Sequence, residues 1–459
     1  MLKKNDVIKL NITDLTNLGF GVGHHDGQVV FVSDAVMGDV VSAKIIKVNK
    51  SYAIARCEQI ISPSEKRCDG RCSVRACKSC AYKCISYKEE LALKHGIVKG
   101  AFEHEGMNDV TVHPTLPSPD ELRYRNKGQY PVSMTKDGEY VVGFYAPRSH
   151  RVTEARCCPL LPVEFEAVIN TLTDYFKKYK IPVYDEESGK GLLRHIYLRR
   201  AEVTEQILLT LIINGAHLPE EAELVKTVRD NHPEIVGILV NENQKNTNII
   251  LGDDYRTLFG KDYITDVLAD VRLKISAPAF YQVNRRAADR LYRIAGELAK
   301  PTKDDLLLDL FCGAGSIGLS MANECGELVG IEIIDAAVEC ARENAAANGI
   351  NHAKFYTGDA SDTEKLLLNA EAQLGKKLTP DVIILDPPRA GCDEKLIDFI
   401  SKLSAKRIVY ISCNPTTLAR DCKRFRKNGF EIGDVYAVDL FPMTGHVESV
   451  VCLTRAFDN

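Results

Sequence analysis

The chain has 459 residues, enough for two to four domains that each bury a core. Apolar residues make up 45% of the sequence and charged residues 27%, and the net charge of −4 excludes a uniformly basic nucleic-acid coat while leaving room for local basic surfaces. The first residues carry charge without an apolar signal core, and no apolar run is long enough to span a bilayer. We therefore expect a cytoplasmic protein that has no contact with membranes.

Residues 1–61 alternate apolar and polar side chains, with glycines between the alternating runs. This pattern predicts short strands separated by tight turns. The predicted strands are Asp6–Ile12, Val29–Val32, Val40–Val48 and Tyr52–Ile60. Such an arrangement is typical of a small OB-like β-barrel. Its basic and acidic residues nearly balance, so charge alone does not distinguish an RNA-binding barrel from a spacer.

Five of the fifteen cysteines fall between Cys68 and Cys84. In a reducing compartment such crowding indicates metal binding or catalysis rather than disulfides. The rest of the range 62–270 mixes helical and strand-like patterns, which predicts a central α+β domain. Its predicted helices cover residues 87–103 and 162–180, and its predicted strands cover residues 139–145, 206–213 and 235–241.

From residue 271 to 459, short apolar strands alternate with helices rich in Ala, Leu, Glu and Arg. Strand–helix alternation of this kind predicts a doubly wound, mostly parallel sheet of Rossmann-like type. The predicted strands are Leu306–Phe311, Leu328–Glu332, Lys354–Tyr356, Val382–Asp386 and Arg407–Ser412.

A glycine-rich turn follows the first of these strands, in the sequence Phe311-Cys312-Gly313-Ala314-Gly315-Ser316-Ile317-Gly318. Such a turn lets the backbone approach a ligand at a helix N-terminus, and taken alone it also fits a dinucleotide-binding loop. Glu332 and Asp359 end the next two strands, where they can meet a ribose and an adenine amino group. Together with Asp309 this set resembles the class I S-adenosylmethionine-binding fold, and a nicotinamide cofactor is the alternative.

Two further strands end in Asp386-Pro387-Pro388-Arg389 and Ser412-Cys413-Asn414-Pro415. The first motif alone would suggest methylation of an exocyclic amine, which needs no cysteine. Carbon 5 of a pyrimidine, in contrast, becomes nucleophilic only after another nucleophile has added to carbon 6. A thiolate suits that addition because it can also leave. Cys413 is therefore the predicted nucleophile, and Glu448 is the predicted base that removes the carbon 5 proton.

These motifs carry a family resemblance. The segments LDLFCGAGSIGL, ILDPPRAGC, ISCNPTTLARD and GHVESV, together with Phe280-Tyr281-Gln282-Val283-Asn284, are similar to those of the RNA 5-methyluridine (uracil-5) methyltransferases over essentially the whole chain. The resemblance implies that Cys413 is the nucleophile and Glu448 the base. It also implies that Gln282, Phe311, Glu332 and Asp386 contact the cofactor or the active site.

Residues 1–61 resemble a TRAM domain through Gly19–Gly23, Gly27–Val32 and Gly38-Asp39, although Met37 stands where a proline is usual. The family commonly carries an iron–sulfur cluster on four cysteines. The resemblance assigns Cys77, Cys80 and Cys158 to it. Cys72 is preferred over Cys68 as the remaining ligand. A [4Fe-4S] cluster is expected, with zinc as the rival metal and an unmetallated loop as the third possibility.

The TRAM-plus-cluster architecture resembles the branch of the family that modifies 23S ribosomal RNA. A transfer-RNA T-loop uridine is the alternative target, and an RNA cytosine-5 methyltransferase or an inactive RNA-binding factor are less favoured functions. We expect a monomer whose phosphate contacts come from basic runs, with tyrosines that stack on unpaired bases. The basic residues are Arg123, Arg125, Lys127, Arg148, Arg151, Arg156, Arg194, Arg199, Arg200, Arg285, Arg286 and Arg290, and the tyrosines are Tyr124, Tyr130 and Tyr197.

Overall fold

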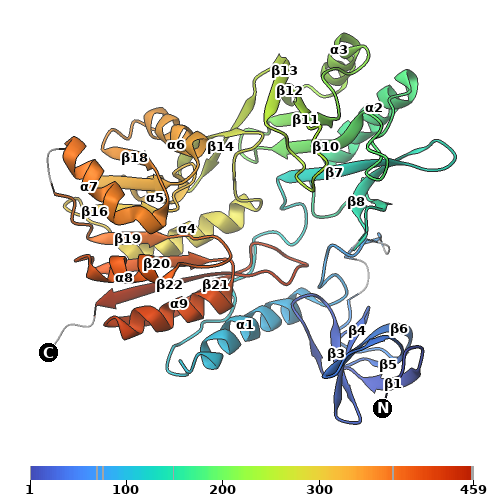
Figure 1. The fold of residues 1–459 in the computed structure, drawn as a ribbon, viewed down its shortest axis with the longest axis horizontal. Helices are drawn as coiled ribbons and strands as arrows, with labels where there is room; N and C mark the ends of the chain where they lie inside the picture. The colour runs from blue at the N-terminus through green and yellow to red at the C-terminus, as the bar shows by residue number, and fades with distance from the viewer. Residues whose placement is uncertain (1, 69–70, 75–76, 148, 375–376, 456–459) are drawn as a thin grey trace.

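The computed structural model describes residues 2–68, 71–74, 77–147, 149–374 and 377–455. An N-terminal barrel, a central α+β sheet and a C-terminal α/β sheet follow one another along the chain (Figure 1). No helix in these described ranges is both long enough and apolar enough to cross a bilayer.

The N-terminal barrel is a six-stranded sheet in the order β1-β5-β6-β4-β3-β2. Its strands are β1 (Val7–Asn11), β2 (Asp14–Leu15), β3 (Gly21–His25), β4 (Gln28–Ser33), β5 (Val40–Val48) and β6 (Tyr52–Ser62). Alternate residues such as Val30, Val32 and Val41 fill the interior, as the period-2 pattern predicts. The buried carboxylate of Asp39 accepts hydrogen bonds from the Ser64 amide and the Arg67 guanidinium, which ties the following segment to the barrel.

The central sheet has seven strands in the order β13-β12-β11-β10-β7-β8-β9. The strands are β7 (Lys127–Met134), β8 (Tyr140–Tyr145), β9 (Val152–Glu154), β10 (Leu193–Arg200), β11 (Ile207–Ile213), β12 (Ile235–Glu242) and β13 (Asp254–Gly260). One face packs against α2 (Val163–Tyr179) and α3 (Glu221–Asn231). The other face shares a core with the hairpin β14 (Tyr263–Leu268) and β15 (Val271–Ser276), which leads into the C-terminal sheet.

The C-terminal sheet has seven strands in the order β18-β17-β16-β19-β20-β22-β21. Strands β16 to β20 are parallel, and β22 joins β20 antiparallel. The strands are β16 (Leu306–Leu310), β17 (Glu327–Glu332), β18 (Ala353–Thr357), β19 (Val382–Leu385), β20 (Arg407–Ser412), β21 (Phe430–Val438) and β22 (Glu448–Arg455).

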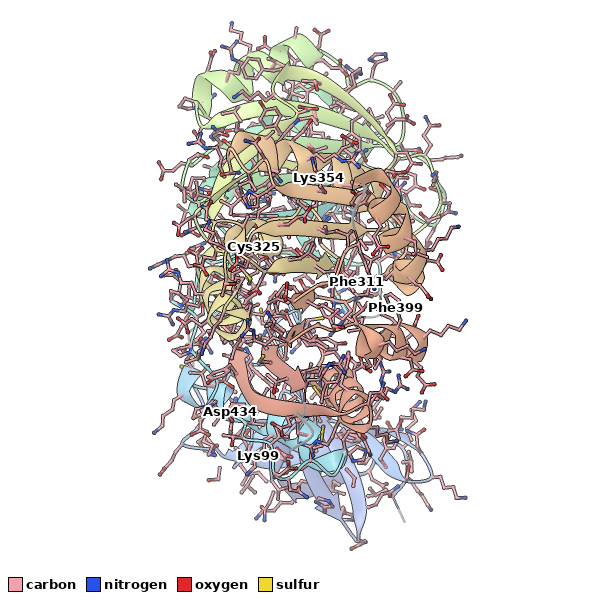
Figure 2. All side chains as sticks on the ribbon, turned by 90° about the vertical axis from the view of Figure 1, so that its left-hand side faces the viewer. Lys99, Phe311, Cys325, Lys354, Phe399 and Asp434 are labelled. Atoms are coloured by element: carbon pink, nitrogen blue, oxygen red, sulfur yellow. The ribbon has the colours of Figure 1, made fainter. Side chains whose placement is uncertain are left out.

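Helices cover both faces of this sheet, because successive residues of each strand point into two different cores. Figure 2 looks at the stacked strands from Lys354 on β18 to Asp434 on β21, with Cys325 on one side and Phe399 on the other. One side carries α4 (Arg285–Ala299), α5 (Ser316–Met321) and α6 (Asp335–Ala347). The other carries α7 (Thr363–Leu374), preceded by the 3-10 turn η1 (Ala360–Asp362), with α8 (Glu394–Lys402), α9 (Pro415–Lys427) and α1 (Tyr87–His104).

The long helix α1 lies alongside α9 although more than three hundred residues separate them in the sequence (Figure 1). Its buried Lys94 forms ion pairs with Glu90 at 2.8 Å and with Asp439 at 2.7 Å. Because a buried charge without a partner is costly, this pairing fixes α1 to the loop that follows β21. The cysteine-rich segment just before α1 is thereby brought close to the C-terminal sheet.

Candidate active site

The structure brings Cys413 and Glu448 together at the carboxyl end of the C-terminal sheet. Cys413 directly follows β20, and Glu448 is the first residue of β22. Ser412 pairs with Ser449 in the antiparallel register, so the next position on each strand sets Cys413 opposite Glu448. Opposed residues on antiparallel strands have Cβ atoms about 4.5–5.5 Å apart. Strand pairing therefore places a thiol and a carboxylate side by side.

Residues on either side of Cys413 fix its backbone. The Asn414 amide donates to the Ser412 hydroxyl at 3.1 Å, and the Asn414 side chain accepts from the Thr416 amide at 3.2 Å as the N-cap of α9. Pro415 occupies the first turn, where its missing N–H costs nothing. Cys413 thus lies between a strand end and a helix N-terminus, where the helix dipole favours a thiolate.

The electrostatics of the pair are set by burial and by two charged neighbours. Glu448 is 5% exposed, and burial raises its pKa to about 8, with the charge of Asp386 adding to the shift and Arg389 opposing it. Burial also raises the pKa of Cys413, and the charge of Glu448 raises it further, while Arg389 lowers it. Arg389 is therefore the cation that favours both ionised forms.

Sequence reasoning gave no role to Arg389 or to the residues that hold its loop. The buried carboxylate of Asp421, on α9, accepts from the Tyr410 hydroxyl at 2.7 Å and from the Cys392 amide at 2.9 Å. The neighbouring Arg420 donates to the Ala390 carbonyl at 2.8 Å. These bonds fasten the loop 386–392 to α9. A sequence signal existed, because Asp421 lies among the buried apolar residues of an otherwise basic helix.

The glycine-rich turn after β16 has the backbone that a ligand-binding loop requires. Phe311, Gly313 and Gly315 have φ values of 66°, 54° and 81°, all in the left-handed region. A Cβ atom on Gly313 would meet no atom within 4 Å, so open space lies beside the turn. Glu332 accepts hydrogen bonds from the Gly313 amide at 3.1 Å and the Ile334 amide at 3.0 Å, which fixes its carboxylate against the turn.

Three carboxylates surround this open space. Asp309 accepts from the Gly318 amide at 2.9 Å, but its other oxygen is buried without a hydrogen-bond partner in the described part of the chain. Burial raises the pKa of Asp309 to about 8, with the charges of Asp386 and Glu332 adding to the shift. Burial raises the pKa of Asp386 to about 7. A cationic ligand would relieve this uncompensated negative charge, and the sulfonium of S-adenosylmethionine is such a ligand.

Gln282 and Asp359 lie at two edges of the same region. Gln282 is 8% exposed, and its side chain interacts with the Tyr292 hydroxyl, which lies 3.0 Å from the Ser316 hydroxyl at the start of α5. Asp359 is exposed just beyond β18, next to the strand that ends in Glu332. The sheet order therefore lines up the ends of β18, β17, β16, β19 and β20, so the predicted cofactor and catalytic residues share one edge.

The four cysteines predicted as cluster ligands line one cavity of about 260 Å³. Burial raises the pKa of Cys80 to about 12, with the charges of Cys158, Cys77 and Cys72 adding to the shift. Cys68 does not line the cavity, and its backbone amide donates to the Cys84 carbonyl at 2.9 Å. Within the described ranges, no three His, Cys, Asp or Glu side chains converge closely enough to hold a single metal ion.

Most of the basic residues proposed for RNA have internal partners. Arg156, Arg200, Arg285 and Arg286 form ion pairs, and Arg148 lies outside the described residues. Arg123, Arg194, Arg199 and Arg290 donate to backbone carbonyls. Arg125, Lys127 and Arg151 form no ion pair with the part of the chain that is described. Arg125 and Lys127 line the cysteine cavity next to Thr444.

The predicted stacking of RNA bases on Tyr124, Tyr130 and Tyr197 is wrong. Their exposures are 6%, 0% and 1%, so none offers a ring face to a base. The physical reason is that both faces of the central sheet are covered: Tyr130 lies in the core under α2 and Tyr197 in the core shared with β14 and β15. Tyr124, just before β7, packs against Leu160 and Met443. Phe280, two residues before Gln282, is in contrast 73% exposed.

Comparison with known proteins identifies the family. The model of the tRNA (uracil-5-)-methyltransferase family matches residues 226–456, and the TRAM domain model matches residues 2–57. The chain belongs to the tRNA (uracil-5-)-methyltransferase family. Membership confirms the predicted enzyme class, an S-adenosylmethionine-dependent RNA (uracil-5-)-methyltransferase, and the predicted TRAM domain at the N-terminus.

Relatives of similar length support this family over the whole chain. A protein of Listeria innocua described as an uncharacterized RNA methyltransferase is 38% identical and covers 99% of both chains. A protein of Clostridium acetobutylicum with the same description is also 38% identical, covering 99% of this chain and 98% of its own. The tRNA (uracil-54, C5)-methyltransferase of Pyrococcus abyssi, solved with S-adenosyl-L-homocysteine, is 25% identical with a TM-score of 0.78, covering 97% of this chain and all of that one.

Proposed function

We propose that this enzyme methylates carbon 5 of a uridine in 23S ribosomal RNA through a covalent adduct between Cys413 and carbon 6. The observation that carries the proposal is the position of Cys413 and Glu448, which directly adjoin the Ser412–Ser449 pair where β20 ends and β22 begins. Direct methylation of an amine would need neither a nucleophile nor a base at that position. An addition–elimination on carbon requires both.

The residues act in sequence on the pyrimidine ring. The Cys413 thiolate adds to carbon 6, and the electrons of the 5,6 double bond move toward carbon 5 and the carbon 4 carbonyl. S-adenosylmethionine supplies, when bound, the electrophilic methyl group that carbon 5 takes up. Glu448 then removes the proton from carbon 5, the double bond re-forms, and the Cys413 sulfur leaves as a thiolate. The Glu448 proton returns to solvent before the next turnover.

Arg389 supports the first step in this scheme. Its positive charge lowers the pKa of Cys413 against the opposing effects of burial and of Glu448. The guanidinium also lies 3.2 Å from the His446 ring nitrogen, which keeps it at the mouth of the site. We propose that Arg389 is a positioning residue for the thiolate. Phe280, exposed beside Gln282, is the proposed stacking surface for a base that has been swung out of the RNA.

The cofactor site is proposed on the carboxyl edge of the sheet. Glu332 would accept the ribose hydroxyls, and Asp359 would face the adenine amino group. Asp386 would lie between cofactor and uracil, and Phe311, Gly313 and Gln282 would shape the walls. The donor set fits the cofactor, because an unpartnered Asp309 oxygen and the raised pKa of Asp386 both call for a cation.

We propose that Cys72, Cys77, Cys80 and Cys158 hold a [4Fe-4S] cluster. Four thiols around a 260 Å³ cavity support this, since the corners of a cluster are separate and its ligands need not converge on one point as those of a zinc ion do. When bound, the cluster supplies a cross-link between the cysteine segment and the central sheet. Metal and sulfide analysis of protein purified without oxygen decides the matter: iron with sulfide supports the cluster, and zinc alone contradicts it.

There are two candidate RNA targets. The TRAM-plus-cysteine architecture favours 23S ribosomal RNA. The matching family model and the Pyrococcus abyssi protein are both named for transfer RNA, which makes a transfer-RNA uridine the second candidate. Mapping 5-methyluridine in total RNA from cells with and without this protein tests both. Loss of the nucleoside from ribosomal RNA supports the proposal, and loss confined to transfer RNA contradicts it.

A further inference from the structure

The loop 439–447 connects β21 to β22 and delivers Glu448 to the site. Four carbonyl groups along this loop accept hydrogen bonds from four separate parts of the chain. Asn284 donates to Leu440 at 3.0 Å, Lys94 to Phe441 at 3.1 Å, Tyr124 to Pro442 at 2.9 Å and the Tyr82 amide to Met443 at 2.9 Å. Other parts of the chain therefore fix the path of the loop, because none of these four donors belongs to the loop itself.

The TRAM domain touches the same loop at Gly445. A Cβ atom on Gly445 would lie 1.9 Å from the Asn17 carbonyl oxygen and 2.8 Å from its Cα atom. No side chain fits in that space, so the backbones of two domains are in direct contact. Gly445 stands three residues before Glu448, and no other structural element intervenes.

Asn17 belongs to a tight turn, residues 16–20, between β2 and β3. The Thr16 hydroxyl accepts from the Phe20 amide at 3.0 Å, and the Gly19 amide donates to the Thr16 carbonyl at 2.9 Å. Gly19 packs against the cysteine segment, where an added Cβ atom would lie 2.5 Å from the Ala81 carbonyl oxygen. One side of the turn therefore contacts Ala81, and the other side contacts Gly445.

We propose that this TRAM turn positions the catalytic base, with Asn17 pressing on Gly445 to hold the loop that carries Glu448. The inference rests on the proposed function, in which Glu448 removes the carbon 5 proton. It gives the N-terminal domain a part in the chemical step besides any contact with RNA. A displacement of about 1 Å in a reacting group can cost about 100-fold in rate, so a contact of this kind matters to proton removal.

The test is Gly445→Ala in the full chain, with Gly96→Ala as the matched control because an added Cβ there meets nothing within 4 Å. RNA containing 5-fluorouridine measures the formation of the adduct, which does not need the base. RNA containing 5-deuterouridine measures proton removal. We expect Gly445→Ala to be trapped by 5-fluorouridine at the wild-type rate. On uridine it should release product about 10- to 100-fold more slowly, with an isotope effect that the control lacks.

Thr16→Ala provides a second variant, since it loosens the turn from a distance without adding an atom at the contact. It should show the same change in the same step, to a smaller degree. Melting temperature and S-adenosylmethionine affinity show whether either variant is misfolded. If Gly445→Ala is misfolded, the result for Thr16→Ala tests the inference.

Two results would overturn the inference. If 5-fluorouridine trapping and product release slow equally, the contact supports the fold in general. If the folded variants release product at the wild-type rate, the contact has no effect on the reaction. Glu448→Gln, assayed alongside, separates this from the proposed function. If that variant turns over normally, the assignment of the base fails. If it stalls while Gly445→Ala does not, only the role of the TRAM turn fails.

Discussion

Cys413 and Glu448 face each other because β22 runs antiparallel to β20 and starts where β20 ends. Their proximity depends on the β21–β22 hairpin, in which β21 forms the sheet edge and β22 inserts between β21 and β20. Two residues on separate motifs become one site through a single strand register. A shift of one residue in that register would turn the carboxylate to the opposite face.

Replacing Glu448 by Gln should separate the two halves of the reaction. The amide cannot accept the carbon 5 proton, so the methylated adduct should accumulate while formation of the adduct continues. We expect product release to fall by about 100- to 10,000-fold, the usual contribution of a general base. Denaturing gel electrophoresis with labelled RNA measures the trapped species. Normal turnover in this variant would remove Glu448 from the mechanism.

The rate of product release should rise with pH. The pKa of Glu448 is raised to about 8, and only the ionised carboxylate accepts a proton, so the active fraction increases as pH rises and levels off above that value. Single-turnover release measured between pH 6 and 9 (roughly one to two units on either side of a base of this kind) checks the direction. Release that is flat or falls across this range would be inconsistent with a carboxylate base in this environment.

Binding of S-adenosylmethionine should release protons near neutral pH. The pKa of Asp386 is raised to about 7 by burial, and a cationic ligand favours its ionised form. Affinity should therefore increase as pH rises through neutrality, whereas S-adenosylhomocysteine, which lacks the sulfonium charge, should show a weaker dependence. Calorimetry in buffers of different ionisation enthalpy counts the protons. Asp386→Asn is the matched variant, and it should lose the difference between the two ligands.

Arg125 and Lys127 should contribute to RNA affinity without changing the chemistry. Neither has an ion-pair partner in the described ranges, and both border a cavity beside the loop 439–447. In Arg125→Gln and Lys127→Gln the slope of log affinity against log salt should fall by about 0.7 to 0.9 per lost phosphate contact. KM should rise with kcat unchanged. Lys354→Gln, on the far edge of the sheet in Figure 2, is the control.

An unchanged salt slope would contradict this role for the two cations. If the variants also bound less iron than the wild type, the two side chains would instead compensate the charge of the proposed iron–sulfur cluster.

The alternating strand–helix pattern was sufficient to predict the parallel part of the C-terminal sheet. The strands that contain Leu308 and Val382 are short and mainly apolar and are followed by polar motifs. The observed strands β16 to β20 agree with the predicted ones to within a residue or two. The positions of Asp386, Glu332 and Cys413 at one edge follow directly, because parallel strands present their carboxyl ends together.

Several antiparallel strands were not predicted, among them β7, β10, β21 and β22, whereas their neighbours β8, β11 and β12 were predicted to within a residue. Buried charged residues such as Arg199 on β10 and Glu448 on β22 interrupt the apolar positions, so neither a clean period-2 pattern nor an apolar run marks these strands. The pairing of the same strands decides which side chains are buried and which are exposed. Local sequence could therefore list the basic and aromatic residues of the central domain, but it could not assign them to a face.

Contacts between segments far apart in the chain could also not be predicted from the sequence. Charged residues such as Lys94 on a helix and Asp439 in a loop are usually exposed, yet both side chains are fully buried and form an ion pair with each other. Gly445 reads as part of a motif, and its closeness to Asn17 is visible only when two domains are folded together. These long-range contacts depend on the packing of α1 and the TRAM domain, which no local periodicity encodes.

The most direct measurement of the mechanism is covalent capture by RNA in which the target uridine is replaced by 5-fluorouridine. Fluorine cannot leave as a proton, so the adduct formed by the Cys413 thiolate persists after methyl transfer. The account predicts a protein–RNA complex that survives denaturation with the wild-type enzyme and none with Cys413→Ala. A complex that forms equally well with Cys413→Ala, or turnover of ordinary RNA by that variant, would contradict it.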